Sequence, residues 1–144
     1  MGDFDYQVNL TFIDPKLTGW SKPEALFAQI GIENVQIGIE NVDFTGCPKL
    51  VSIAPFIFRK CHCMQSIKFS DSVTKICESA FHECNSLTSL VLPKRLSVVE
   101  KGGFAQMRKL RSVVFNGELT SLGERAFQFC PSLNKIDLSI CNNS

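Results

Sequence analysis

The amino-acid sequence predicts an α/β repeat solenoid made of short parallel strands and turns, with a strand and a helix capping its N-terminal end. Three observations predict this fold. Phenylalanines recur every 23 residues from residue 58 onwards, the same order of apolar residues follows each of them, and a segment without this repeat precedes them. A fixed period of this length indicates one supersecondary unit stacked on copies of itself, with each copy burying its apolar face against its neighbours.

Residues 1–43 are expected to form the N-terminal capping segment. Apolar residues alternate with polar ones at Phe4, Tyr6, Val8, Leu10 and Phe12. This period of two is typical of a half-buried strand, which Pro15 ends. The motif Ser21-Lys-Pro-Glu is a capping box with proline in the first turn, so a short helix is expected over about residues 21–30. We expect the strand and helix to cover the end of the solenoid; alternatively, the helix contacts a partner.

Residues 44–144 are expected to form the repeat solenoid, with four to five repeats. The first of them copies the apolar pattern of the others at Phe44, Cys47, Leu50 and Ile53. Phe58, however, follows Phe44 after 14 residues instead of 23. The repeat at 44–57 is therefore expected to be shortened, with a tight or irregular crossing at its end.

Columns of equivalent residues define the later repeats. The aromatic column is Phe58, Phe81, Phe104 and Phe127, and a sulfur column three positions later is Cys61, Cys84, Met107 and Cys130. Within one repeat, Leu87, Leu90 and Leu92 follow the order apolar-x-x-apolar-x-apolar, which predicts a short strand. A second apolar stretch follows at 73–76, 96–99 and 119–122 and supplies the return path of each repeat.

The stretch from Ala80 to Pro93, Ala-Phe-His-Glu-Cys-Asn-Ser-Leu-Thr-Ser-Leu-Val-Leu-Pro, closely resembles the BspA-like class of leucine-rich repeats. The resemblance covers residues 58–144 well, residues 39–53 in part, and nothing before that. It implies a leucine-rich-repeat solenoid that is not an enzyme and that binds a protein partner of unknown identity. BspA-like proteins look mostly like surface or host-contact proteins of bacteria and protists, so the resemblance also implies adhesion or host contact.

The N-terminus bears on the location of the protein. The segment Met1-Gly-Asp-Phe-Asp-Tyr is acidic and lacks the basic and apolar regions of a signal peptide. If Met1 is the natural start, the chain is expected in the cytoplasm, whereas the resemblance implies the cell surface or secretion. No apolar run is long enough to cross a bilayer, so no membrane insertion is expected.

Composition and motifs argue against several functions. A formal net charge of +1 argues against a nucleic-acid partner, because nucleic-acid-binding domains are usually strongly basic. Neither a glycine-rich phosphate loop nor a pair of carboxylates stands out, so we expect no catalytic residues and no cofactor. The run Cys61-His-Cys63, with His82 and Cys84, has a zinc-like composition. Adjacent residues on an extended chain point apart, so no metal site is expected there.

Most of the seven cysteines are expected to be packing residues. Four of them occupy the sulfur column at Cys47, Cys61, Cys84 and Cys130. Met107 substitutes in the same column, which indicates an apolar site where free cysteine acts as a small hydrophobe. The expected accessible thiols are the three outside that column, Cys63, Cys77 and Cys141.

The residues between the buried columns of the strands face outward and form ladders across the repeats. The expected ladders are Val51, Gln65, Thr88, Arg111 and Asn134; Ser52, Ser66, Ser89, Ser112 and Lys135; and Ala54, Lys68, Val91, Val114 and Asp137. The serines fit an ordinary strand surface. Val91 and Val114 form an apolar centre with a charged rim, which is typical of a protein-binding patch. The candidate partner-binding residues are Lys68, Thr88, Val91, Arg111, Val114 and Asp137.

The last repeat ends after its strand, and no further repeat follows it in the sequence. Its apolar residues are Leu133, Ile136, Leu138 and Ile140, and its strand presents an open edge that can pair with another chain. Either the chain is a fragment of a longer array, or another copy covers this end. We therefore expect self-association through these four residues, as a homodimer or a higher oligomer. An alternative function follows, that of an intracellular scaffold or self-assembling structural protein.

Overall fold

The computed structural model describes residues 41–45, 50–117 and 119–137. The strand expected between Phe4 and Phe12 and the helix expected over residues 21–30 lie outside these ranges. In the described ranges the chain forms strands and turns, with no helix.

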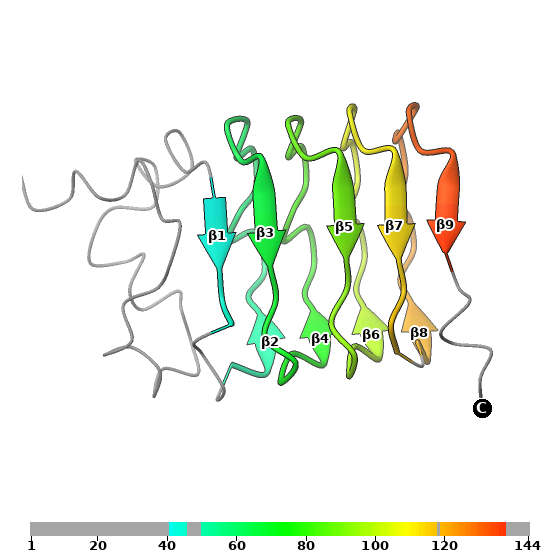
Figure 1. Ribbon diagram of the computed structural model, residues 1–144. Coiled ribbons are helices and arrows are strands. Elements are labelled where there is room, and N and C mark those ends of the chain that lie inside the picture. The colour runs from blue at the N-terminus through cyan, green and yellow to red at the C-terminus, as the bar shows by residue number, and fades with distance from the viewer. Residues whose placement is uncertain (1–40, 46–49, 118, 138–144) are drawn as a thin grey trace, which may run out of the picture.

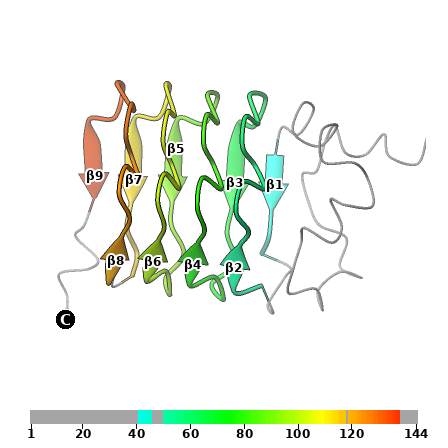
Figure 2. The same cartoon turned by 180° about the vertical axis from the view of Figure 1, so that it is seen from behind.

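The described chain winds as a solenoid with strands on two faces (Figures 1 and 2). One face carries β1 (Asn41–Asp43), β3 (Ser66–Lys68), β5 (Ser89–Val91), β7 (Ser112–Val114) and β9 (Lys135–Asp137). We call it the odd-strand face. The other face, which we call the even-strand face, carries β2 (Ser52–Ile53), β4 (Lys75–Ile76), β6 (Val98–Val99) and β8 (Ser121–Leu122). Each pairing between these strands is parallel, which confirms the expected parallel-strand solenoid.

The strand register follows the 23-residue period of the sequence. On the even-strand face, Lys75 lies opposite Val98, which lies opposite Ser121. On the odd-strand face, Ser89 and Ser112 are opposite each other, and Lys135 follows. Equivalent positions of successive repeats therefore stack directly on one another, as expected from the columns.

The first coil, meaning the first turn of the solenoid, differs from the expectation. β1 pairs with β3, so Asn41 lies opposite Ser66, 25 residues away, whereas Ser52 of β2 lies opposite Lys75. Phe44 thus follows a strand, as Phe69 does, and is not part of the aromatic column of the turns. The expectation of a shortened repeat at 44–57 is therefore wrong. This coil begins at β1, before residue 44, and is two residues longer than the other coils.

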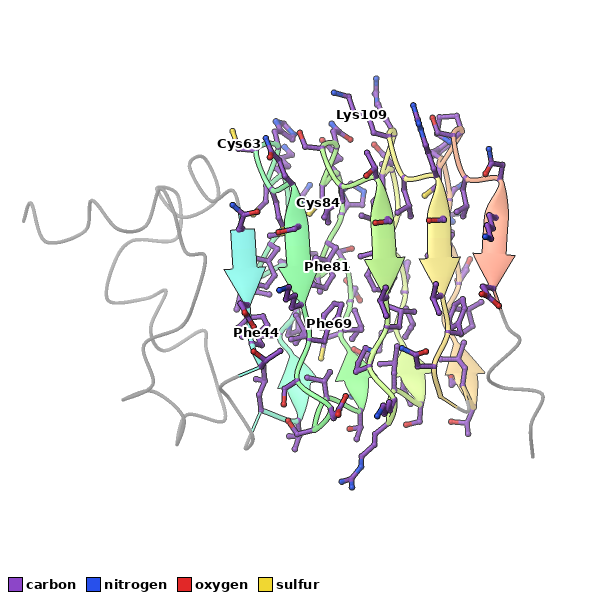
Figure 3. The ribbon with its side chains drawn as sticks, viewed as in Figure 1. Phe44, Cys63, Phe69, Phe81, Cys84 and Lys109 are labelled. Atoms are coloured by element: carbon purple, nitrogen blue, oxygen red, sulfur yellow. The ribbon has the colours of Figure 1, made fainter. Side chains whose placement is uncertain are left out.

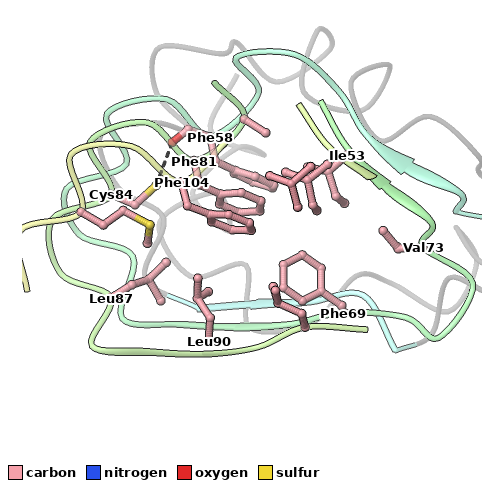
Figure 4. Close-up of a cluster of buried hydrophobic side chains, with 14 of the residues drawn as sticks. Ile53, Phe58, Phe69, Val73, Phe81, Cys84, Leu87, Leu90 and Phe104 are labelled. Carbon is pink, nitrogen blue, oxygen red and sulfur yellow. Dashed lines mark hydrogen bonds between the residues drawn. The ribbon is translucent and has the colours of Figure 1, made fainter. Parts of the chain in front are cut away.

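The apolar columns fill the space between the two strand faces (Figure 3). The rings of Phe58, Phe81 and Phe104 stack with centroids 5.3 Å apart at each step (Figure 4). Phe127 continues the stack at 5.3 Å. Phe58, Phe81 and Phe104 are completely buried. Because one ring per coil contacts the next, the stack sets the spacing of the coils in the core behind the odd-strand face.

Candidate interaction surface

The odd-strand face presents the side chains on either side of the central residue of each strand. Leu90 and Val113 point inward and are buried, so the residues flanking them point outward, as strand geometry requires. The outward side chains form rows across the strands (Figure 3).

The structure brings five of the six candidate partner-binding residues together. Val91, Val114 and Asp137 lie opposite one another in β5, β7 and β9. Thr88 and Arg111 precede β5 and β7, and the Arg111 backbone N–H donates to the Thr88 carbonyl at 2.8 Å. The sixth, Lys68, lies on β3, which does not pair with β5.

Exposure and charge make this row suitable for contact with a protein. Val91 is 57% exposed, and Val114 beside it is half-buried. Arg111 is exposed on one side of this apolar pair, and Asp137 lies at the end of the row. An exposed apolar centre with opposite charges at its rim is typical of protein interfaces.

Two surface residues of this face were missed in the sequence. Asn41 lies opposite Ser66, whose hydroxyl lies 2.6 Å from the Asn41 Oδ1 and donates to it. Asp43 lies opposite Lys68. Asn41 and Asp43 occupy the ladder positions expected for Ser52 and Ala54, which lie in or beside β2. Val51, expected in the first ladder, also lies beside β2. The likeness of Asn41-Val-Asp-Phe44 to Ser66-Ile-Lys-Phe69 would have revealed the correct register.

The sulfur column lies in the core. Cys61 and Cys84 are completely buried, and the Cys84 Sγ donates to the Phe58 carbonyl at 3.1 Å. The hydrogen bond with Cys84, together with burial, raises the pKa of the Cys61 thiol above its ordinary value. Burial likewise raises the pKa of the half-buried Cys130. Because a thiol with a raised pKa is less often ionised, Cys61 and Cys130 are weak nucleophiles.

The other cysteines divide differently from the expectation. Cys63 is exposed, as expected, but Cys77 is only 8% exposed, so its predicted accessibility was wrong. Cys77 directly follows β4, and its N–H donates to the Ile53 carbonyl at 3.0 Å, which holds it against the neighbouring coil. Cys47 and Cys141 lie outside the described residues.

The cysteine- and histidine-rich turns do not assemble a metal centre. In the ranges that the structure describes, no three Cys, His, Asp or Glu side chains are placed to hold a metal ion. Glu83 instead lies between two histidines, with its Oε1 3.5 Å from His82 Nδ1 and its Oε2 3.9 Å from His62 Nε2. Cys61 and Cys84 point into the core, away from these groups.

The C-terminal end of the described solenoid is a second apolar surface. Ile136 is 50% exposed and Leu133 is half-buried, whereas Val113, the counterpart of Ile136, is buried. Leu122 and Phe129, which were not among the candidates, are 54% and 66% exposed. Phe129 lines a cavity of about 750 Å³, together with Gln106, Arg108, Phe127, Cys130 and Pro131. Two further candidates for self-association, Leu138 and Ile140, lie outside the described residues.

The comparison with family models decides the classification. The model of the BspA type leucine rich repeat region, with six copies, matches residues 23–144. The chain belongs to the BspA-type leucine-rich repeat family. The resemblance seen in the repeats is thereby confirmed, and this BspA-type region begins at residue 23, within the segment expected to be only a cap.

Solved structures of leucine-rich repeat proteins agree with this classification. A leucine-rich cell surface protein from Faecalibacterium prausnitzii is 27% identical with a TM-score of 0.55, and covers 69% of this chain and 30% of its own length. A leucine-rich repeat protein from Bacteroides ovatus is 26% identical with a TM-score of 0.57. The match covers 69% of this chain and 31% of that protein. A leucine-rich repeat protein from T. pallidum is 26% identical with a TM-score of 0.59. The match covers 69% of this chain and 52% of that protein.

This BspA-type chain thus spans about a third to a half of the length of these solved proteins. No curated protein matches it. Within the described ranges, the structure contains no helix with the length and apolar character needed to span a membrane.

Proposed function

We propose that the chain is a non-enzymatic protein-interaction module that binds a protein partner through its odd-strand face. The observation that supports this function best is the in-register row of Val91, Val114 and Asp137, with Arg111 beside it. The family supports the same function, because leucine-rich repeats are commonly protein-interaction modules.

The scaffold suits this function because it holds the row without help from a ligand. Each strand of the row is tied to the next by backbone hydrogen bonds, such as that from the Leu92 N–H to the Val114 carbonyl at 2.9 Å. The stacked rings behind the sheet hold the coils at a constant spacing. A preorganised surface loses little conformational entropy on binding, so more of the contact energy appears as affinity.

Adhesion or host contact at the cell surface is the more specific form of this proposal. It is supported by the similarity to the Faecalibacterium prausnitzii protein, which is described as a leucine-rich cell surface protein. In this form, the partner is a protein on another cell or in its surroundings.

Partner capture with variants of the row tests the proposal. The immobilised chain is incubated with a cell extract, and captured proteins are identified by mass spectrometry for the wild type, for Val91→Glu with Val114→Glu, and for Val51→Glu. Val51 is the matched control, because it is 52% exposed but adjoins β2 of the even-strand face. A partner that is lost at least tenfold with the double variant and kept with Val51→Glu supports the proposal. Equal capture by all three proteins contradicts it.

A second candidate function is a scaffold or self-assembling structural protein. It is favoured by the exposed apolar residues Leu122, Phe129 and Ile136 at the C-terminal end of the described solenoid. Exposed apolar patches of this kind promote association between copies. The two functions are compatible, because the end of the solenoid and the odd-strand face are different surfaces.

A further inference from the structure

The odd-strand face is interrupted between β3 and β5. Among the described strands, β3 pairs only with β1 and β5 only with β7, whereas β2, β4, β6 and β8 form one continuous sheet on the other face. The interruption is visible in Figure 1, where β3 and β5 stand apart. The same two coils remain joined elsewhere, through the β4–β6 pair and the 5.3 Å stack of Phe81 on Phe104.

Backbone hydrogen bonds that join the other strands are missing at this interruption. The Leu92 N–H donates to the Val114 carbonyl at 2.9 Å, and the Phe115 N–H donates to the Asp137 carbonyl at 3.0 Å. The equivalent pair across the interruption is Phe69 and Val91. Among the described residues, no hydrogen bond joins them, and none joins any other backbone group of β3 to β5.

Strand geometry identifies the backbone N–H and C=O groups that face the interruption between β3 and β5. Alternate residues of a parallel strand turn their N–H and C=O groups to opposite neighbours. Since Leu92 bonds to the β7 side, Ser89 and Val91 turn their peptide groups toward β3. By the same alternation, Ile67 and Phe69 turn theirs toward β5. Both walls of the gap therefore present N–H donors and C=O acceptors at strand spacing.

The gap is part of a cavity. A volume of about 360 Å³ lies along these strands, with Lys68, Asp71, Asn116 and Thr45 among its polar lining residues and Val91 and Pro93 among its apolar ones. Ile67 is half-buried beside it, whereas its equivalents Leu90 and Val113 are buried. We call this cavity and its two strand edges the strand cleft.

We propose that the strand cleft binds an extended polypeptide segment of the partner, whose peptide groups pair with the open edges of β3 and β5. This inference rests on the proposed function and names the subsite and the form of the partner. A peptide backbone alternates N–H and C=O groups, as both walls do, and backbone pairing with an open strand edge is an established mode of peptide recognition. The apolar surface of Val91 and Pro93 suits a β-branched side chain on the segment.

The charges of the cleft also favour a peptide. Among the described residues that line it, Lys68 is the one cation, and Asp71 on the same cavity offsets that charge. A phosphate or another polyanion needs several cations, whereas a polypeptide needs balanced donors and acceptors.

The structure allows the cleft to widen for such a segment. The two coils that form its walls are held by the β4–β6 pair on the opposite face and by the hydrogen bond from the Phe81 N–H to the Gly103 carbonyl at 2.9 Å. These contacts act as a hinge line. The odd-strand face opens without loss of an existing bond between β3 and β5, because there is none.

Amide hydrogen exchange measured by NMR tests the inference. The probe is a blocked Thr-Val-Thr-Val-Thr peptide, and the control probe is the same peptide with alternate amides N-methylated. In the free protein, the amides of Ile67, Phe69, Ser89 and Val91 are expected to exchange at least tenfold faster than that of Leu92. The first probe slows them at least tenfold, and the N-methylated probe does not. Equal protection of all these amides in the free protein, or no effect of the first probe, overturns the inference.

A matched pair of proline variants gives a second test. Ser89→Pro removes an N–H that faces the cleft, so its unfolding midpoint is expected to match that of the wild type while the probe binds at least tenfold more weakly. Ser112→Pro removes the N–H that donates to the Thr88 carbonyl at 3.4 Å, so its midpoint falls. Unchanged probe affinity in folded Ser89→Pro overturns the inference. The N-methylated probe gives the same answer on the wild type if this variant does not fold.

The two proposals fail in different ways. A partner that is lost with the Val91→Glu and Val114→Glu double variant but retained by Ser89→Pro leaves the proposed function standing and removes the cleft. A partner retained by both removes the odd-strand face as the binding surface.

Discussion

The turns of this solenoid depend on single residues with left-handed backbone conformations. Two positions of each repeat have a positive φ, and only one of the eight residues that occupy them in the described chain is glycine. They are Phe56, Lys60, Ser79, Glu83, Gly102, Gln106, Arg125 and Phe129. Such a conformation costs a non-glycine residue about 1–2 kcal/mol. Hydrogen bonds between turns offset this cost, for example from the Lys60 N–H to the His82 carbonyl at 2.8 Å.

Lys60→Gly should therefore stabilise the protein. Glycine relieves the strain at φ 62° and keeps the backbone N–H, although it adds freedom to the unfolded chain, so we expect a net gain of about 0.5–1 kcal/mol in urea unfolding. Arg59→Gly is the control, because Arg59 is also exposed but has no positive φ, and it should lower stability by about 0.5–1 kcal/mol. Equal losses for the two variants would show that the turn carries no strain.

At the scale of elements, the aromatic column joins successive turns of the solenoid. Phe104 stacks on Phe81 at 5.3 Å and on Phe127 at 5.3 Å and is completely buried. Phe127 is only partly buried, because no further ring follows it in the described chain. The same residue type thus has different surroundings in the middle and at the end of the stack.

Phe104→Ala should lower the free energy of unfolding by about 3–5 kcal/mol, as large-to-small changes in a packed core do. Phe127→Ala should cost clearly less, because one face of that ring has no partner ring to lose. Chemical denaturation of both variants measures the difference. Equal losses would mean that the ring stack does not carry the coil-to-coil contact.

At the scale of the whole molecule, the backbone hydrogen bonds between the turns run in one direction along the axis of the solenoid. Turn N–H groups donate to the following coil, as from Phe104 to the Ala126 carbonyl at 2.8 Å and from Gln106 to the Gln128 carbonyl at 2.7 Å. Phe127 and Phe129 occupy the same positions in the last turn, and no described residue accepts from their N–H groups. A second copy that covers this end must therefore supply carbonyl groups as well as apolar surface.

Self-association through this end predicts a concentration-dependent mass. Light scattering should show the wild type growing beyond one chain as concentration rises, while Ile136→Lys stays at the mass of a single chain because a charge enters the apolar contact. Val51→Lys, changed at a residue of similar exposure near β2, should behave as the wild type. A wild type that remains a single chain at high concentration would contradict the prediction.

Much of the fold and part of the site could be predicted from the sequence. The aromatic and sulfur columns, the strands at Leu90 and Val113, and the outward position of Val91 follow from the period alone. This is possible because each unit must bury the same positions against its neighbours, so burial is repeated along the chain.

What the sequence alone determined is therefore the repeating unit and which of its residues are buried. The tertiary structure decided how each unit joins the next: the register of the first coil, the burial of Cys77 and the interruption between β3 and β5. The physical reason is that these features depend on backbone hydrogen bonds between residues more than 20 positions apart. Every non-proline residue offers the same N–H and C=O groups to such a bond, so residue type does not reveal which bonds form.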